Sequence, residues 1–528
     1  MATRSKPGHT RDISRRQLLK EGGAVAGALS AVVTPFAIAR AAKPARIAAP
    51  YGVQCGDVLH DRAVLWSYAD HEARMWVELA DNDAFRNARR VRGPVASPDT
   101  GMTARLDVQG LTPGRAHVYR IWFESLDGGR HDSAPRHGRF VTPTADTSAA
   151  TARPVRFLWS GDVAGQGWGI NPELGGMRIF DTMRRLAPDF FIHCGDSIYA
   201  DNPIEPEVTL PDGVVWRNRV TPAKQAVAQT LDEFRGNYRY NLLDDNLRAF
   251  NAQVPMYAQW DDHEVVNNWY PGELLDDDRY DEKSVDVLAA RAHRAFAEYM
   301  PVRFGPRGRL YQSFSCGPHL EIFRLDMRSF RGPNSANLQS RSSAATAFLG
   351  SEQLAWLKTA LRRSRARWKI IAADMPIGLV VRDGDHFEAV ANADHGAPLG
   401  RELEVADLLA FVRRHDIRNL VWLTADVHYT AAHHYHPDRA AFQDFLPFYE
   451  FVSGPLNAGT FGPNELDRSF GPEVLYQKAP ADGEMNLPPS AGMQFFGQVD
   501  VSSDGQQLTV TLRDVAGVAL FTRILDAD

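Results

Sequence analysis

Five short apolar segments of the chain are each followed within two residues by an aspartate, and no other feature limits the possible folds as much. The segments alternate with amphipathic stretches, which predicts an α/β fold. These predicted strands cover 155–160, 190–194, 254–260, 368–373 and 420–424, and a sixth strand covers 320–325. The aspartates that follow the first five are Asp162, Asp196, Asp261, Asp262, Asp374 and Asp426. Because ligands of α/β sheets gather outside the carboxyl ends of strands, we expect these carboxylates to meet at one edge.

So many carboxylates in one place require positive charge. Unpaired, they would repel one another and stay partly protonated, whereas multivalent cations allow them to ionise. Oxygen ligands suit Ca²⁺, Mg²⁺, Mn²⁺ or Fe³⁺. A single aspartate at a strand end is more often the N-cap of the next helix. The prediction of a metal site therefore depends on the repeated pattern and on two histidines beside it, His263 and His428.

The composition excludes several other classes of protein. Of the 528 residues, 44% are apolar and 23% are charged, which is typical of a globular chain and not of a disordered one or a coiled coil. The net charge of −6 provides no general basic field for nucleic acid. The three cysteines, Cys55, Cys194 and Cys316, are too few for a disulfide scaffold and allow at most one disulfide.

The first 41 residues are expected to be a twin-arginine signal peptide. Residues 14–20 contain the paired Arg15 and Arg16, an Ala/Gly-rich apolar run covers 22–39, and small residues at 39 and 41 form a cleavage site. A permanent membrane anchor is the alternative, but the run is only weakly apolar. No later stretch approaches the roughly 20 apolar residues of a membrane-spanning helix. We therefore expect a periplasmic or secreted protein, exported by the twin-arginine translocation machinery.

Two regions follow the signal peptide. Residues 47–146 contain short aromatic and β-branched segments between turns, which predicts an all-β domain of immunoglobulin or fibronectin-III type. Residues 153–528 contain the α/β pattern. Its predicted helices cover 175–186, 221–250, 284–299, 351–364 and 401–415. The segment 382–400 is long for a loop and is a candidate lid or substrate loop.

Several of these motifs resemble a known series. Gly161-Asp162, Gly195-Asp196 with Tyr199, the Asp-Asp-His-Glu run at 261–264, and Asp426 with His428 are similar to the motifs of the calcineurin-like metallophosphoesterase superfamily. The run with Trp260, together with the segment 325–331, resembles the alkaline phosphatase D (PhoD-like) family within it. The resemblance covers nearly the whole chain. It implies a metallophosphoesterase-type β-sandwich core flanked by helices.

The resemblance also implies a role for individual residues. Asp196 matches the carboxylate that bridges two metals, and Tyr199 matches a phenolate ligand of Fe³⁺. The other implied metal ligands are Asp162, Asp262, Asp374, Asp426 and His428. His263 matches the residue that protonates the leaving group or approaches the phosphate. The residues that could bind substrate are Arg328, Arg331 and Asn268, although both arginines could instead pair with structural acids.

The sequence departs from the family pattern at two places. Asp162 stands where the family has a cysteine ligand, so the metal preference at the first site is open. Asp374 and Asp426 stand where many relatives have histidine. All-oxygen ligation favours Ca²⁺ over Zn²⁺ at the second site. The expected cofactors are therefore Fe³⁺ and Ca²⁺, with Mn²⁺ or Zn²⁺ as alternatives.

The function that follows is hydrolysis of phosphate esters by an exported phosphatase or phosphodiesterase, in which a metal-activated hydroxide attacks in line. One alternative keeps this chemistry but changes the substrate, as in a phospholipase D-like phosphodiesterase or an exonuclease. A second alternative is a non-catalytic exported protein that binds metal or mediates surface adhesion. Asp-Asp-His-Glu at 261–264 argues against the second alternative, because binding alone does not require His263.

Overall fold

Two β-sheets packed face to face form the centre of the protein. The computed structural model describes residues 46–128, 132–145 and 152–528, so the expected signal peptide lies outside the described residues. Within these residues the first sheet has nine strands. Their order is β24 (Ala519–Asp526), β23 (Gln507–Asp514), β22 (Phe495–Val501), β8 (Val155–Ser160), β9 (Phe190–Cys194), β12 (Met256–Gln259), β1 (Val53–Leu59), β2 (Arg62–Tyr68) and β5 (Thr103–Gln109).

The second sheet of the sandwich has seven strands in the described part of the chain. Their order is β13 (Gln312–Ser315), β14 (Leu320–Arg324), β15 (Trp368–Ala372), β18 (Leu420–Thr424), β20 (Phe448–Val452), β19 (Thr430–Tyr435) and β21 (Pro472–Lys478). The inner faces of the two sheets share one apolar core, in which Trp159 and Phe190 of the first sheet join Ile370 and Leu423 of the second. Both faces of the inner strands are buried, which explains why these segments read as continuous apolar runs.

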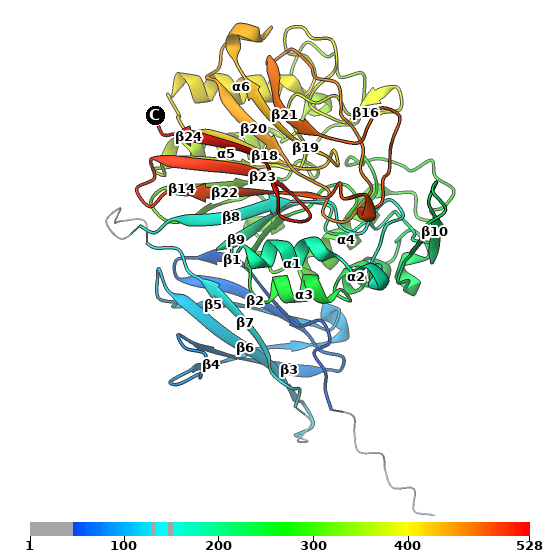
Figure 1. Ribbon diagram of the computed structural model, residues 1–528, viewed down its shortest axis with the longest axis vertical. Coiled ribbons are helices and arrows are strands. Elements are labelled where there is room, and N and C mark those ends of the chain that lie inside the picture. Colours follow the sequence, from blue (N-terminus) through cyan, green and yellow to red (C-terminus); the bar gives the residue numbers. More distant parts are fainter. Residues whose placement is uncertain (1–45, 129–131, 146–151) are drawn as a thin grey trace, which may run out of the picture. The chain divides into compact units, whose positions relative to one another are not determined.

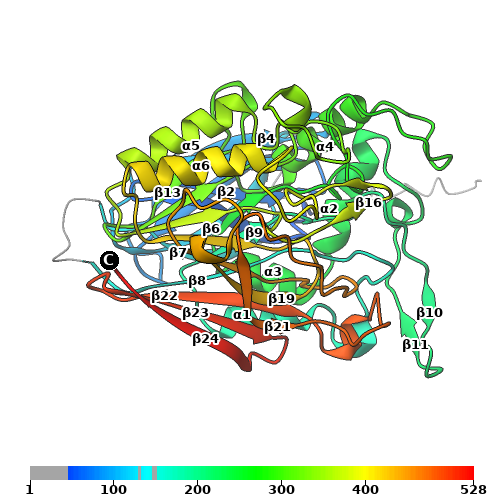
Figure 2. The same cartoon turned by 90° about the horizontal axis from the view of Figure 1, so that it is seen from above.

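Helices cover the outer face of each sheet (Figures 1 and 2). On the first sheet lie α1 (Arg178–Arg185), α2 (Leu231–Asn241), α3 (Asp245–Asn251) and α4 (Val285–Tyr299), packed into a core with Leu158 and Phe191. On the second lie α5 (Ser351–Arg363) and α6 (Glu402–Arg414), packed against Phe323 and Trp422. The predicted class, a β-sandwich core flanked by helices, is confirmed. Among the described residues no helix is both long and apolar enough to cross a membrane.

The N-terminal region is all β, as predicted, and its strands extend the large sheet (Figure 1). β1, β2 and β5 belong to the nine-stranded sheet. A separate four-stranded sheet packs on them, in the order β4 (Arg89–Ala96), β3 (Ala73–Ala80), β6 (Ala116–Ser125) and β7 (Arg136–Val141). Gly56 joins the two regions, because it pairs with Met256 of β12 and a Cβ there would lie 2.4 Å from the Pro301 carbonyl oxygen. The boundary between 146 and 153 stays a prediction.

One predicted helix differs in the structure. The segment 221–250 was expected to be a single helix, and it forms α2 and α3 with a break at 242–244. Asp244 causes the break: its side chain accepts hydrogen bonds from the backbone N–H groups of Leu247 and Met177, each at 2.9 Å. The carboxylate thereby caps α3 and holds the segment before α1. The other four predicted helices and the six predicted strands lie within a few residues of their predicted bounds.

The direction of the strands decides where the loops of the site lie. β8, β9 and β12 run parallel in the first sheet, and β14, β15, β18 and β20 run parallel in the second. The loops after these strands therefore gather at one edge of the sandwich.

The segment 382–400 contains a small hairpin, β16 (Arg382–Asp383) and β17 (His386–Phe387). A second hairpin is formed by β10 (Glu207–Thr209) and β11 (Val215–Arg217). All three cysteines are buried thiols.

Candidate metal centre

The loops at the carboxyl ends of the strands bring the predicted ligands together. Asp162 follows β8, Asp196 follows β9, and Asp426 and His428 follow β18. All four have left-handed backbone conformations, with φ of 70°, 51°, 64° and 60° in that order. Such angles are uncommon for residues other than glycine and concentrate at functional sites, where the surrounding structure holds them. The sharp turns point short side chains across the edge of the sandwich.

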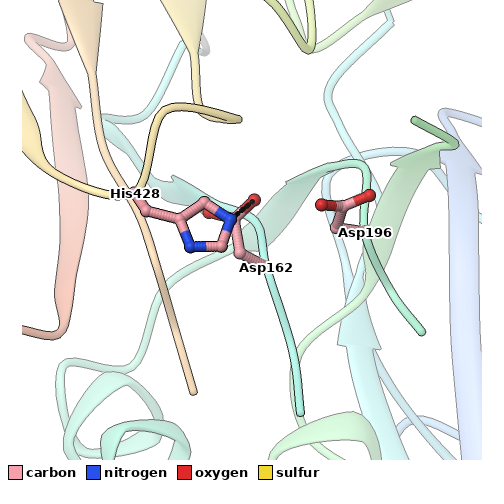
Figure 3. A group of neighbouring side chains, drawn as sticks. All are labelled: Asp162, Asp196 and His428. Carbon is pink, nitrogen blue, oxygen red and sulfur yellow. Dashed lines mark ion pairs between the residues drawn. The ribbon is translucent and has the colours of Figure 1, made fainter. Parts of the chain in front are cut away.

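Asp162, Asp196 and His428 form the first of three acidic groups (Figure 3). One ligand atom from each lies within 4.8 Å of the others, and His428 Nε2 is 3.8 Å from Asp162 Oδ1. His428 Nδ1 bonds to the Gly459 carbonyl oxygen, which can only accept, so Nδ1 carries the proton and Nε2 carries the lone pair. Burial lowers the pKa of His428 to about 4, which keeps the ring neutral and suited to bind a metal.

Tyr199 completes this first group. Its hydroxyl is 2.7 Å from His428 Nε2. The second carboxylate oxygen of Asp162 is buried and has no hydrogen-bond partner. Burial raises the pKa of both Asp162 and Asp196 well above the ordinary value, with added repulsion from Asp262 and Glu264. A cation would supply the missing partner and restore the ionised form, so the donor set fits a metal ion.

The second group consists of Asp196, Asp262 and His263. Asp196 therefore belongs to both groups, as expected for a bridging carboxylate. Asp262 Oδ2 accepts the backbone N–H of Asn268 at 2.7 Å, while its Oδ1 is buried without a hydrogen-bond partner. Burial opposes ionisation of Asp262, but His263 and Arg328 outweigh it and lower the pKa of Asp262 to about 2. This group also offers an unpartnered ionised oxygen to a cation.

Asp201 holds His263, and the sequence analysis did not identify it. His263 Nδ1 lies 2.7 Å from Asp201 Oδ1, and the other oxygen of Asp201 accepts the Asn267 backbone N–H at 3.0 Å. The Tyr199 ring stacks on the imidazole with centroids 4.2 Å apart. Burial lowers the pKa of His263, but the carboxylates of Asp201, Asp262 and Asp196 outweigh burial and raise it well above the ordinary value. The sequence offered one signal for this role, because Asp201 lies in the same loop as Asp196 and Tyr199.

Glu264 holds two loops of the site together, while Asp201 holds the His263 ring. Glu264 accepts hydrogen bonds from the backbone N–H groups of Asp196, Ser197 and Asp261, at 3.1, 2.6 and 2.8 Å. It therefore ties the loop after β9 to the loop after β12. Gly195 makes this approach possible: its φ is +103°, and a Cβ there would lie 2.4 Å from the Asp261 Cβ.

Asp261, Asp262 and Asp426 form the third group, and a buried arginine contacts all three. Arg328 Nε is 2.5 Å from Asp261 Oδ1, and its Nη2 is 3.5 Å from Asp426 Oδ1 and 3.8 Å from Asp262 Oδ2. Nε also lies 3.4 Å from Asp374, and Nη1 pairs with Glu388. Burial opposes its charge, but these carboxylates raise the pKa of Arg328 well above the ordinary value.

A cavity of about 250 Å³ opens over the first two groups. Six of the predicted site residues line it: Asp196, Asp262, His263, Asn268, Asp426 and His428. The other predicted residues, Asp162, Tyr199, Asp374, Arg328 and Arg331, are buried outside its lining. Arg331 donates to Asn334 Oδ1 at 3.0 Å and pairs with Glu388. A role of the two arginines in substrate binding therefore stays a prediction.

The lining also contains residues that no motif identified. Gln166, Glu388, Phe461 and Asn464 come from loops whose sequence carries no recognisable pattern. The predicted substrate loop does reach the site, because it supplies Glu388, and Asp383 Oδ1 accepts the Asn268 side-chain amide at 3.2 Å. The lining therefore combines acids and two histidines with amides and an aromatic ring.

The fold resembles two solved phosphatase structures. The structure of PhoD aligns with a TM-score of 0.67 and 20% sequence identity, over 92% of this chain and 90% of that one. A purple acid phosphatase from yellow lupin seeds aligns with a TM-score of 0.56 and 12% identity, over 90% of this chain and 74% of that one. Both alignments show that the two-sheet fold is shared with these proteins.

Sequence comparison assigns the family. The family model of the PhoD-like phosphatases matches residues 157–512, and that of their N-terminal domain matches residues 35–144. The chain is also 26% identical over 484 residues to alkaline phosphatase D of Bacillus subtilis (strain 168), covering 85% of this chain and 77% of that protein. The chain belongs to the PhoD-like phosphatase family. The predicted family and enzyme class are confirmed, which sets aside the non-catalytic alternative.

Proposed function

We propose that the protein is an exported alkaline phosphatase or phosphodiesterase that hydrolyses phosphate esters in the cavity over Asp196. The observation that carries this proposal is the pair of ligand groups that share Asp196, beside a histidine held by Asp201. Two cations held by these groups would stabilise the negative charge on the phosphoryl oxygens. His263 would face the departing oxygen or a phosphoryl oxygen, because it lines the same cavity.

The two groups favour different metals. The first offers a phenol, an imidazole and two carboxylates, and burial raises the pKa of Tyr199 well above its ordinary value. Only a strongly polarising ion would deprotonate this phenol, which favours Fe³⁺ with Asp162, Asp196, Tyr199 and His428 as ligands. The second offers the carboxylates of Asp196 and Asp262, which favour Ca²⁺, with Mn²⁺ or Zn²⁺ as alternatives.

The residues of the chain have separate tasks in the reaction. When bound, the metal ions polarise the phosphoryl oxygens and lower the pKa of the attacking water. His263 donates Nδ1–H to Asp201, which stabilises the charged imidazolium and leaves the Nε2 proton for the departing oxygen. Asn268 is held by Asp262 and Asp383 and lines the cavity, where its amide would orient the ester.

The test is the Asp196→Asn variant. We expect hydrolysis of both p-nitrophenyl phosphate and bis-p-nitrophenyl phosphate to be lost, because one shared ligand of both ions is weakened. Elemental analysis should show fewer bound ions, while circular dichroism stays that of the wild type. Asp500→Asn, on β22 and paired with Arg156 away from the cavity, is the matched control. Full turnover of either substrate by a folded Asp196→Asn protein would overturn the proposal.

Export is the second part of the proposal, and it depends on residues 1–41. Replacing Arg15 and Arg16 by lysine should keep the protein in the cytoplasm, as measured by cell fractionation. Periplasmic or secreted activity from that variant would contradict the twin-arginine route. Turnover of liposomes or of nucleic acid would separate the phospholipase-like and exonuclease alternatives from a general phosphatase.

A further inference from the structure

Four apolar side chains line the cavity over the metal centre, and no step of the proposed reaction uses them. They are Val381, Val427, Phe461 and Pro463. Val381 and Val427 pack in one apolar cluster. Phe461 lies next to this cluster, because its backbone N–H donates to the carbonyl oxygen of His428, the residue after Val427, at 3.3 Å. Together the four residues form an apolar wall of the cavity.

The loop that carries the aromatic ring of the wall is fixed by two neighbouring segments. Asn464 donates its backbone N–H to the Tyr429 hydroxyl at 3.3 Å and its side-chain amide to the Val380 carbonyl oxygen at 2.9 Å. Gly462 allows the close approach: its φ is +83°, and a Cβ there would lie 2.5 Å from Tyr429 Cδ1. The wall is therefore formed without a ligand, so that binding against it requires little further ordering of the protein.

Phe461 is the largest member of the wall. Its ring is half-buried and lies beside the His428 imidazole, with the ring centroids 5.4 Å apart and the planes inclined at 58°. The same side chain lines the cavity. An apolar ring thus lies next to a residue of the first acidic group, close to where a phosphoryl group would bind.

The lining provides no positive side chain for an anionic organic group. Its acids are Asp196, Asp262, Glu388 and Asp426, and none of the described residues that line the cavity is a lysine or an arginine. Bound metal ions would neutralise the phosphoryl group. A second negative charge, on the organic part of the ester, would find no cation at the apolar wall and would be repelled by the acids.

We propose, on the basis of the function proposed above, that the apolar wall receives the organic part of the ester. The site then selects phosphate esters in which this part is uncharged and apolar or aromatic. Phe461 is the specificity-determining residue, because burial of an organic group against its ring removes apolar surface from water on both sides. An ester whose organic part carries its own carboxylate or phosphate is bound more weakly.

The experiment measures the binding of three phosphonates to the metal-loaded protein by isothermal titration calorimetry at alkaline pH. The three are phenylphosphonate, methylphosphonate and 4-carboxyphenylphosphonate, which share the phosphoryl group and are not hydrolysed. We expect phenylphosphonate to bind about tenfold more tightly than methylphosphonate to the wild type. The carboxyphenyl compound should bind more weakly than phenylphosphonate, because its added charge meets no cation.

In Phe461→Ala the dissociation constants for phenylphosphonate and methylphosphonate should become nearly equal, whereas Phe461→Leu should keep most of the difference. Elemental analysis should show unchanged metal content in both variants, which separates contact with the ligand from support of His428. The matched control is Phe521→Ala: this half-buried ring of β24 stacks on Tyr476 at 5.4 Å and does not line the cavity. It should leave all three constants unchanged.

Equal affinity of the wild type for the phenyl and methyl compounds would overturn the inference, and so would an undiminished preference in folded Phe461→Ala. Binding of the carboxyphenyl compound as tightly as phenylphosphonate would overturn its charge selectivity. If Phe461→Ala does not fold, Phe461→Leu and the three wild-type constants decide in the same way. The proposed function fails separately: a wild type that binds the phosphonates in the expected order but hydrolyses neither p-nitrophenyl ester would overturn that function and leave this inference intact.

Discussion

His263 shows how a single contact gives a residue its chemical role. Its motif indicated a catalytic histidine, but the motif does not show which carboxylate holds the ring. In the structure Asp201 takes this position at 2.7 Å, and Asp201 is 62 residues away in the sequence. The dyad selects the tautomer and stabilises the charged ring. For Arg328 the sequence left two roles open, substrate binding or pairing with acids, and in the structure its contacts are with the buried carboxylates of Asp261 and Glu388.

We therefore expect Asp201→Asn to lower kcat by about 10²-fold for alkyl phosphate esters, since the imidazolium that is proposed to protonate the leaving oxygen would lose its counter-charge. The loss should be smaller for p-nitrophenyl esters, whose leaving group departs without a proton. Steady-state kinetics with both classes measure the difference, and elemental analysis should show unchanged metal content. Asp181→Asn, in a surface pair with Arg184, is the control. An equal loss with both leaving groups would contradict proton delivery by His263.

At the level of elements, strand ends and helix caps decide which residues meet. β8, β9, β12, β15 and β18 each deliver at least one acid to the same edge, and Glu264 ties two of these loops together. The break between α2 and α3 belongs to the same level. One buried carboxylate, Asp244, caps α3 and holds the Met177 backbone at the start of α1. An apolar pattern continuous over 221–250 does not reveal such a break, because the cap also depends on a contact with a distant segment.

Asp244→Ala should lower the free energy of unfolding by about 1–2 kcal/mol, since a cap is lost and the Met177 N–H is left without its partner. Urea unfolding followed by circular dichroism measures this change. Asp245→Ala is the matched control: Asp245 is the next residue, its side chain is 90% exposed, and it pairs with Arg248 on the surface. The free energy of unfolding should fall in Asp244→Ala and stay near the wild-type value in Asp245→Ala. Equal stability would mean that the break does not depend on this carboxylate.

For the molecule as a whole, a buried ionisable group outside the metal centre makes the stability of the fold depend on pH. Glu402 at the start of α6 is buried, accepts the Asn392 side-chain amide at 3.2 Å, and lies near Asp467. Burial and the Asp467 carboxylate raise its pKa from 4.5 to about 8. The folded state therefore holds a proton that the unfolded state releases at lower pH. This difference lowers the stability of the fold as the pH rises from about 4.5 to about 8.

Glu402→Gln removes this dependence. We expect the variant to unfold at a higher temperature than the wild type at pH 8, and the advantage to shrink toward pH 5, where the wild-type carboxyl is protonated in the folded state. Thermal unfolding at both pH values, with metal present throughout, measures the difference. Glu352→Gln, at an exposed position of α5, should change neither value. A gain that is the same at pH 5 and pH 8 would contradict a titrating carboxyl at 402.

The sequence alone determined the fold class and most of the candidate metal ligands, because strands that are buried on both faces have a continuous apolar pattern and their ends carry short, recognisable motifs. Asp162, Asp196, Tyr199, Asp262, Asp426 and His428 all lie in such motifs, and the structure places them together. Only the tertiary structure showed the contacts of Asp201, Glu388 and Arg328 and the joining of β1 to β12. These contacts connect residues that are far apart in the sequence and carry no local pattern. They exist because packing two sheets face to face brings distant loops to one edge, where buried charges must find partners.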